Sequence, residues 1–214
     1  MKKIVTICLL FLFCSVALGA RFGNVHIGDD TNYVERTIDG EIVLHGTARV
    51  SSCHIFESRE LAPGSSGATE TQLGNYVGYA YTINDDTVIS FPMNKLHGWD
   101  STSDLTVSIR YYINEAYATA NGELQFEASW GATADGEAVD SPGSSDTIDS
   151  GDWNIPATAK HLSQAVLGTI PAASIEATDE IGIDIKRVAL DDGNNPTAEP
   201  VIVCVAIGYT RNGI

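Results

Sequence analysis

The sequence predicts an all-β protein that folds as an antiparallel β-sandwich of the jelly-roll type. Short runs of alternating apolar and polar residues fill the chain, and Gly, Asn, Asp and Ser separate them. A period of two puts every second side chain on one buried face. No long segment shows the helical period of about 3.6 residues. Because 214 residues suit one well-filled core, we expect one sandwich domain over residues 21–214.

Residues 1–20 have the three parts of a secretory signal peptide. Two lysines follow the initiating methionine, an apolar run covers residues 4–17, and the small residues Gly19 and Ala20 end the segment. We expect an export signal that is removed from the mature protein. The alternative is an uncleaved anchor.

The clearest strand pattern joins two runs of strict alternation. Apolar residues take the odd positions in Leu105–Ile113 and the even positions in Glu123–Trp130. Asn121 and Gly122 precede the second run, and this dipeptide favours the positive φ of a tight turn. The pattern predicts a hairpin of two antiparallel strands.

Two further patterns predict strands elsewhere. Tyr76–Ile83 and Thr87–Met93 flank a polar turn and predict a second hairpin. In Glu180–Leu190 the apolar residues change from odd to even positions near the end. One extra residue in a strand causes such a change, so we expect a β-bulge near Lys186–Val188.

The last strand, Val201–Tyr209, is apolar on both faces. A sandwich strand normally buries one face, so the second must be covered as well. Small residues on that second face would allow another element to approach closely. We expect a neighbouring copy of the chain to lie there, or else a local loop. The predicted interface residues are Ile202, Cys204, Ala206 and Gly208.

The charge of the chain limits its partners. The formal net charge is −16 at pH 7. Nucleic acids and anionic membranes bind basic patches. We therefore expect no nucleic-acid partner, and no membrane partner after the signal is removed.

Two cysteines remain once the signal is removed, Cys53 and Cys204. In an exported chain they could form a disulfide that closes a long loop. They could equally stay as two buried thiols, and the sequence leaves both states open. A C-x-x-C spacing, which would indicate a metal site, is absent.

An acidic segment rich in Gly and Ser covers residues 132–152. Clustered carboxylates can hold Ca²⁺, and Asp146, Asp149 and Asp152 are the candidate ligands. The D-x-D-x-D-G register of a dedicated calcium loop is missing. A solvated acidic loop without metal is the alternative, and no other cofactor is expected.

Three tryptophans are candidates for stacking against a sugar. Trp130 ends an alternating run on its apolar face, so core packing accounts for it. Trp99 and Trp153 stand in turn-like contexts and are the candidate ligand-binding residues. Packing at the ends of the sandwich is the alternative for both.

No catalytic motif is present. The five histidines stand in unrelated contexts, and none belongs to an H-E-x-x-H zinc motif. The loop that contains Ser65 has the spacing G-S-S-G and therefore lacks a G-x-S-x-G nucleophile elbow. We expect no enzyme activity and assign no catalytic residue.

Two phrases of the sequence resemble a loosely defined group of β-rich proteins from tailed phages and aquatic viromes. They are residues 22–50, with Asn32–Glu35 and Gly46–Val50, and residues 89–111, with Ile89–Met93 and Asp104–Tyr111. The resemblance implies a tail-fibre-like or other virion surface protein with a jelly-roll fold that forms trimers. Such proteins do not normally carry a signal peptide, so the chain is either exported or begins nearer Phe22.

These observations lead to one expected role and one alternative. We expect a non-enzymatic surface or virion-type structural protein that self-associates, with a trimer favoured. Loops at the ends of the sandwich could bind a glycan or receptor. It would be secreted or periplasmic if the signal is used, and in the virion if the chain starts near Phe22. The alternative is a secreted, monomeric carbohydrate-binding module.

Overall fold

The computed structural model describes residues 25–28, 33–36, 42–44, 50–118 and 122–211. The chain divides into two compact units, of which the larger covers Ser51–Thr210 and holds the sandwich. The smaller unit contains a separate antiparallel sheet in the order β1-β2-β3. Its strands are β1 (Val25–Gly28), β2 (Tyr33–Arg36) and β3 (Ile42–Leu44). The predicted signal peptide at residues 1–20 lies outside the described residues.

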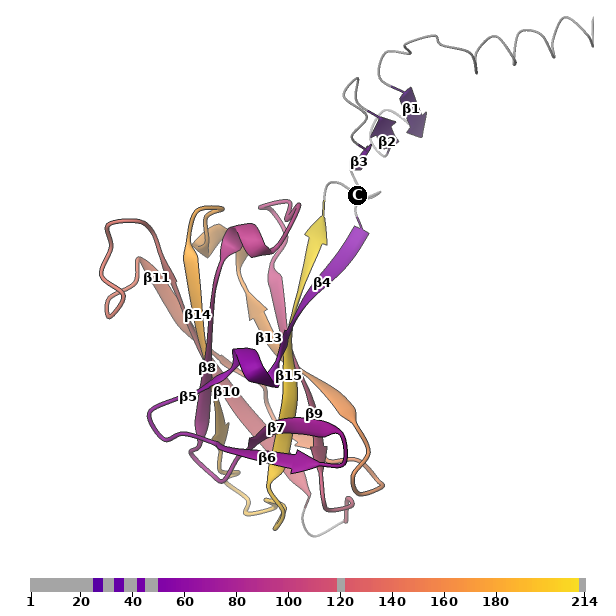
Figure 1. The fold of residues 1–214 in the computed structure, drawn as a ribbon, viewed down its shortest axis with the longest axis vertical. Coiled ribbons are helices and arrows are strands. Elements are labelled where there is room, and N and C mark those ends of the chain that lie inside the picture. Colours follow the sequence, from indigo (N-terminus) through magenta and orange to yellow (C-terminus); the bar gives the residue numbers. More distant parts are fainter. Residues whose placement is uncertain (1–24, 29–32, 37–41, 45–49, 119–121, 212–214) are drawn as a thin grey trace, which may run out of the picture. The chain divides into compact units, whose positions relative to one another are not determined.

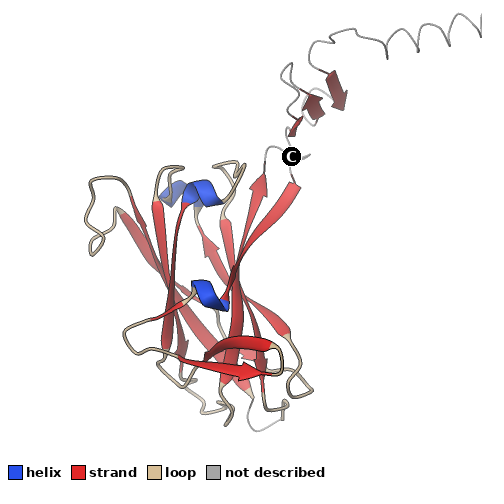
Figure 2. Cartoon of the chain, viewed as in Figure 1, coloured by secondary structure: helices blue, strands red, loops and turns tan. Residues whose placement is uncertain are grey.

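The larger unit confirms the predicted fold class, because two antiparallel six-stranded sheets pack as a sandwich (Figures 1 and 2). One sheet, here called the β14 sheet, has the order β11-β10-β14-β8-β5, with β12 paired to β10. The other, here called the β15 sheet, has the order β13-β9-β15-β7-β6, with β4 paired to β15.

The strands of the β14 sheet are β5 (Ala62–Pro63), β8 (Asp86–Pro92), β10 (Glu123–Thr133), β11 (Ser144–Asp149), β12 (Trp153–Asn154) and β14 (Glu180–Val188). Those of the β15 sheet are β4 (Val50–Glu57), β6 (Thr69–Leu73), β7 (Tyr76–Ala80), β9 (Leu105–Ile113), β13 (Ser163–Ile170) and β15 (Pro200–Arg211). The described helices are the short 3₁₀ turns η2 (Ser58–Glu60), η3 (Met93–Lys95) and η4 (Ala172–Ser174). Over the described part of the chain, no helix has the length and apolarity needed to span a bilayer.

The core lies between the sheets, where the alternating residues of the sequence meet. Leu105, Val107 and Ile109 of β9 are fully buried, and so are Phe126 and Ala128 of β10. All belong to one apolar cluster. Burying a residue of this size contributes about 1.5–3 kcal/mol, so the cluster is the main source of stability.

Both predicted hairpins are wrong, although their strands are present. β9 belongs to the β15 sheet and β10 to the β14 sheet, and β7 and β8 are divided between the sheets in the same way. In each pair the connecting segment crosses from one sheet to the other. Alternation shows which face of a strand is buried, but it does not show which strand lies beside it.

The predicted bulge near Lys186–Val188 is also wrong, because β14 pairs with β10 without a break through Val188. Arg187 keeps the alternation by pointing inward, and it is 3% exposed. Its guanidinium donates to the backbone oxygens of Tyr81 at 2.9 Å and Pro196 at 3.4 Å. These hydrogen bonds compensate for part of the lost hydration, although the Nε atom of Arg187 is buried without a partner.

A buried carboxylate fixes the segment between β5 and β6. Asp86 is 4% exposed and accepts hydrogen bonds from the backbone N–H of Ser65 at 3.1 Å and of Ser66 at 2.8 Å. The Ser65 hydroxyl donates to the same carboxylate at 3.2 Å. This Gly- and Ser-rich loop is therefore bound to the start of β8.

We predict that Asp86→Ala lowers the free energy of unfolding by about 3 kcal/mol or more, because hydrogen bonds to charged groups contribute about 1.5–3 kcal/mol each. Urea denaturation followed by tryptophan fluorescence measures the loss. Asp191→Ala, which removes an exposed carboxylate, is the control and should change stability little. Equal effects of the two substitutions would refute the role given to Asp86.

Candidate functional site

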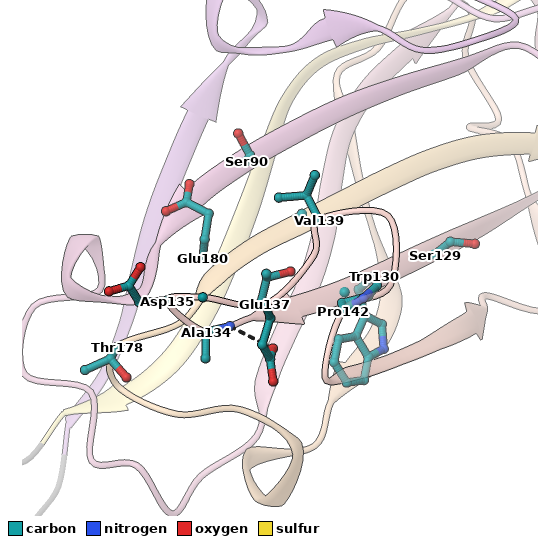
Figure 3. Close-up of a pocket in the computed structure, with 14 residues that line it drawn as sticks. Ser90, Ser129, Trp130, Ala134, Asp135, Glu137, Val139, Pro142, Thr178 and Glu180 are labelled. Carbon is teal, nitrogen blue, oxygen red and sulfur yellow. Dashed lines mark hydrogen bonds between the residues drawn. The ribbon is translucent and has the colours of Figure 1, made fainter.

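An open cleft of about 710 Å³ lies on the outer face of the β14 sheet (Figure 3). Strands β8, β10 and β14 form its floor, and the loop of residues 134–143 between β10 and β11 forms a wall. The lining residues are Ser90, Ser129, Trp130, Gly131, Thr133, Ala134, Asp135, Gly136, Glu137, Val139, Pro142, Thr178, Glu180 and Gly182. Trp130 contributes little to this surface because it is 5% exposed and belongs to the core.

Small residues in register form the floor of the cleft. Gly131 of β10 is paired with Gly182 of β14, and Gly182 is paired with Ser90 of β8. Ile181 and Ile183, on either side of Gly182, point into the core. The row Gly131–Gly182–Ser90 therefore crosses three strands on the outer face with almost no side-chain bulk.

Hydrogen bonds fix the wall of the cleft. The carboxylate of Glu137 accepts from the backbone N–H of Ala134 at 3.0 Å and of Gly143 at 3.2 Å. Pro142 lies over Gly131, where even a Cβ atom would come within 2.9 Å of the proline ring. Gly131 is thus required by the loop that folds back onto the sheet.

The cleft is acidic and rich in hydroxyl groups. Asp135, Glu137 and Glu180 supply carboxylates, and no lysine or arginine is among the lining residues. The hydroxyl groups come from Ser90, Ser129, Thr133 and Thr178. Such a surface disfavours anions and suits ligands that donate hydrogen bonds.

The carboxylate of Asp184 lies beside the cleft, on β14, one of the three strands that form the floor. Asp184 is paired with Ser129 across β10 and β14. Its Oδ1 atom is buried without a hydrogen-bond partner. Burial raises the pKa of the Asp184 carboxyl, the nearby negative charge of Asp86 raises it further, and Lys186 partly opposes both.

We predict that Asp184→Asn is more stable than the wild type at pH 7, that this advantage shrinks as the pH falls through the raised pKa of the folded state, and that it is lost below about 4, the ordinary pKa of an aspartate. A raised pKa means that the folded state holds the proton more tightly than the unfolded state. Ionisation of Asp184 therefore costs stability as the pH rises, and asparagine removes that cost. Urea denaturation at pH 3 and pH 7 tests the sign. A variant that is less stable at pH 7 would contradict it.

The two predicted ligand-binding tryptophans, Trp99 and Trp153, lie outside this cleft, and each donates its indole N–H within the chain. Trp99 donates its indole N–H to the backbone oxygen of Ser103 at 2.9 Å. Trp153 donates to the Tyr111 hydroxyl at 3.0 Å and stacks on Phe126 with ring centroids 5.7 Å apart. Both rings are half-buried against the core.

The structure does not bring the three candidate calcium ligands, Asp146, Asp149 and Asp152, together. The described residues contain no group of three or more His, Cys, Asp or Glu side chains that could hold a metal ion. Asp146 and Asp149 stand three positions apart on β11, so they point to opposite faces of the strand. Asp149 instead accepts hydrogen bonds from the Gln125 amide at 2.8 Å and the Gly151 N–H at 2.9 Å. Asp152 is exposed and lies after β11.

Cys53 and Cys204 are free thiols in this structure, Cys53 exposed and Cys204 buried. They belong to paired strands, β4 and β15. Burial raises the pKa of both thiols, and the positive charge of Arg110 partly opposes this effect.

For the chain that begins at Arg21, we predict that a thiol reagent at pH 8 labels Cys53 in the native protein and Cys204 only after unfolding. Exposure decides the difference, because both thiols are mostly protonated at that pH. Mass spectrometry of peptides identifies the labelled residue. Failure of both residues to react in urea without reductant would show that they form a disulfide.

The predicted interface residues on β15 do not share one face. A register shift between Ile202 and Cys204 lets two consecutive residues lie on the same side of the strand. Ile202 is therefore fully buried in the main core and is wrong as an interface residue. Cys204, Ala206 and Gly208 lie on the outer face, where Cys204 and Ala206 are 8% and 6% exposed.

Larger apolar side chains stand around these small ones on the outer face of the β15 sheet. Val166 is paired with Ser108, and Ser108 is paired with Ala206, so the three residues form a row across β13, β9 and β15. Val166 is 56% exposed. Ile55 of β4 is 44% exposed, and its neighbour Phe56 points into the core. The β6–β7 end of the same face exposes Tyr76 and Leu73.

Comparison with known proteins gives only distant similarities. No protein-family model and no curated protein matches the sequence. Among solved structures, the chain is similar to the CBM36-1 domain of a multidomain xylanase from the hindgut metagenome of Trinervitermes trinervoides. That match has 13% identity and a TM-score of 0.43, and it covers 73% of this chain and 96% of the other.

Two further similarities cover only part of the other protein. Latent PorU of Porphyromonas gingivalis matches with 13% identity and a TM-score of 0.37, covering 77% of this chain and 13% of the other. Infectious bursal disease virus, Gt strain, matches with 10% identity and a TM-score of 0.34, covering 88% of this chain and 40% of the other. At these levels the similarities carry no argument about function, so the role of the chain must be argued from its own surfaces.

Sequence reasoning missed the cleft. Its residues come from three strands and a loop, and hydroxyls and glycines are too common to stand out. One signal was present: Gly182 interrupts the outward face of the strongly alternating run Ile181–Ile185. A glycine inside a strand often marks a close approach of another group.

Proposed function

We propose that the protein is a non-enzymatic surface or virion-type structural protein that assembles with copies of itself. The copies would meet through the outer face of the β15 sheet. The observation that carries this proposal is the row Val166–Ser108–Ala206, with exposed Ile55 on the neighbouring strand β4. A trimer is the expected assembly, by resemblance to the tail-fibre-like group.

The composition of this face favours another copy of the chain as the partner. Small residues at its centre allow two backbones to approach closely, and the larger apolar residues around them would be removed from water. Each removed Å² of apolar surface contributes about 25 cal/mol. The row at the centre carries no charge, although the chain has a net charge of −16. Charged groups of both signs, Arg110 and Glu57, lie near Cys204 beside this row.

A monomeric carbohydrate-binding module is the second candidate, and the cleft on the β14 sheet favours it. The cleft and the apolar face lie on opposite sheets, so one chain could use both. What separates the candidates is whether the chain assembles. Export by the signal peptide and incorporation into a virion remain the two proposed locations.

We predict that the mature chain is an oligomer, a trimer by expectation, and that Ile55→Asp combined with Val166→Asp converts it to monomer. Both side chains are substantially exposed, so the change adds two charges to the interface without entering the core. Light scattering coupled to size exclusion measures the mass, and circular dichroism checks the fold.

Val139→Asp is the matched control, because Val139 is 87% exposed and lies on the opposite sheet's loop. It should leave the assembly unchanged. A wild-type protein that is monomeric at high micromolar concentration would refute the proposal, as would a folded double variant with the wild-type mass.

A further inference from the structure

We propose that the cleft on the outer face of the β14 sheet binds a neutral glycan chain, which is seated over Gly182. This site lies on a sheet face, and neither Trp99 nor Trp153 lines it. It does not depend on self-association, because the proposed interface belongs to the other sheet.

Gly182 is the strongest pointer to a ligand. Glycine inside a strand costs about 0.5–1 kcal/mol relative to alanine, so its presence needs a reason. Its backbone does not have the positive φ that favours glycine. Pairing with β10 and β8 is continuous through this position, so there is no bulge.

Packing within the chain does not require this glycine either. A Cβ atom placed on Gly182 would meet no atom within 4 Å. The neighbouring Gly131 differs, because Pro142 occupies the space above it. Strand glycines without a bulge or a turn mark positions where another group approaches the backbone closely. The open space above Gly182 is the floor of the cleft, so we assign that approach to a bound ligand.

The chemistry of the lining selects a glycan. Asp135 and Glu180 are exposed carboxylates that accept hydrogen bonds from sugar hydroxyls. The lining residues include no lysine or arginine that could hold an anionic ligand. Val139 and Pro142 add apolar surface on the wall, which suits the C–H faces of a sugar ring. The volume of about 710 Å³ fits a segment of a few sugar units.

The wall is held in place before any ligand arrives. The Glu137 carboxylate accepts hydrogen bonds from the backbone N–H groups of Ala134 and Gly143, at the two ends of the loop. The floor belongs to three hydrogen-bonded strands. A site formed in advance loses little conformational entropy on binding, so even a hydrophilic ligand with few apolar contacts can be retained.

Isothermal titration calorimetry tests this site with neutral hexasaccharides of glucose, mannose, xylose and galactose. We expect at least one to bind the wild type, and Gly182→Tyr to weaken that binding at least about ten-fold, or 1.4 kcal/mol. The tyrosine would fill the cleft without meeting other atoms at its Cβ. Asp191→Tyr adds a similar ring at an exposed turn position outside the cleft, and it should bind as the wild type does.

Three results would overturn the inference. The first is that none of the four hexasaccharides binds the wild type. The second is equal binding by the wild type and Gly182→Tyr. The third is binding of hexalysine with no sugar bound, which would show that the carboxylates select a cationic peptide. If Gly182→Tyr does not fold, Gly182→Val fills part of the same space and is measured in its place.

Discussion

The structure depends on keeping the apolar side chains of both sheets on their inward faces. Strand β15 lies inside its sheet, where it pairs with β9 on one side and with β7 and β4 on the other. Its apolar residues occupy both odd and even positions. The register shift after Ile202 resolves the conflict, since Ile202, Val205 and Ile207 all reach the core. Beyond the shift, the outward residues Cys204, Ala206 and Gly208 are small.

The sequence predicted the core well because burial has a direct signature in alternation. The inward residues of β9, β10 and the first part of β14 were placed correctly from their period of two alone. Strand partners could not be predicted in the same way, and both hairpins turned out to be crossings between sheets. The bulge in β14 was predicted because Arg187 is charged and was not expected at an inward position. Its guanidinium donates there to two backbone oxygens.

The sites were harder to predict than the fold. Residue type alone suggested a role for Trp99, Trp153 and the acidic segment. Residue type does not show whether a hydrogen-bonding group already has a partner within the chain. Both indole N–H groups donate within the chain. The cleft instead depends on the open space above Gly182. That space can be recognised only when the register of the three strands is known. The two sheets therefore expose different outer surfaces: a polar cleft on one and an apolar face on the other.

Hydroxyl-radical footprinting of the native protein at assembly concentration tests the central claim most directly, because it reports the exposure of individual side chains. In the single chain, Val166 and Ile55 are 56% and 44% exposed. If the outer face of the β15 sheet is covered by another copy, both should be oxidised much more slowly than their exposure in the single chain implies. Exposed Val139, on the opposite sheet's loop, should react rapidly. Oxidation of Val166 and Ile55 at the rates that their single-chain exposure implies would contradict the account.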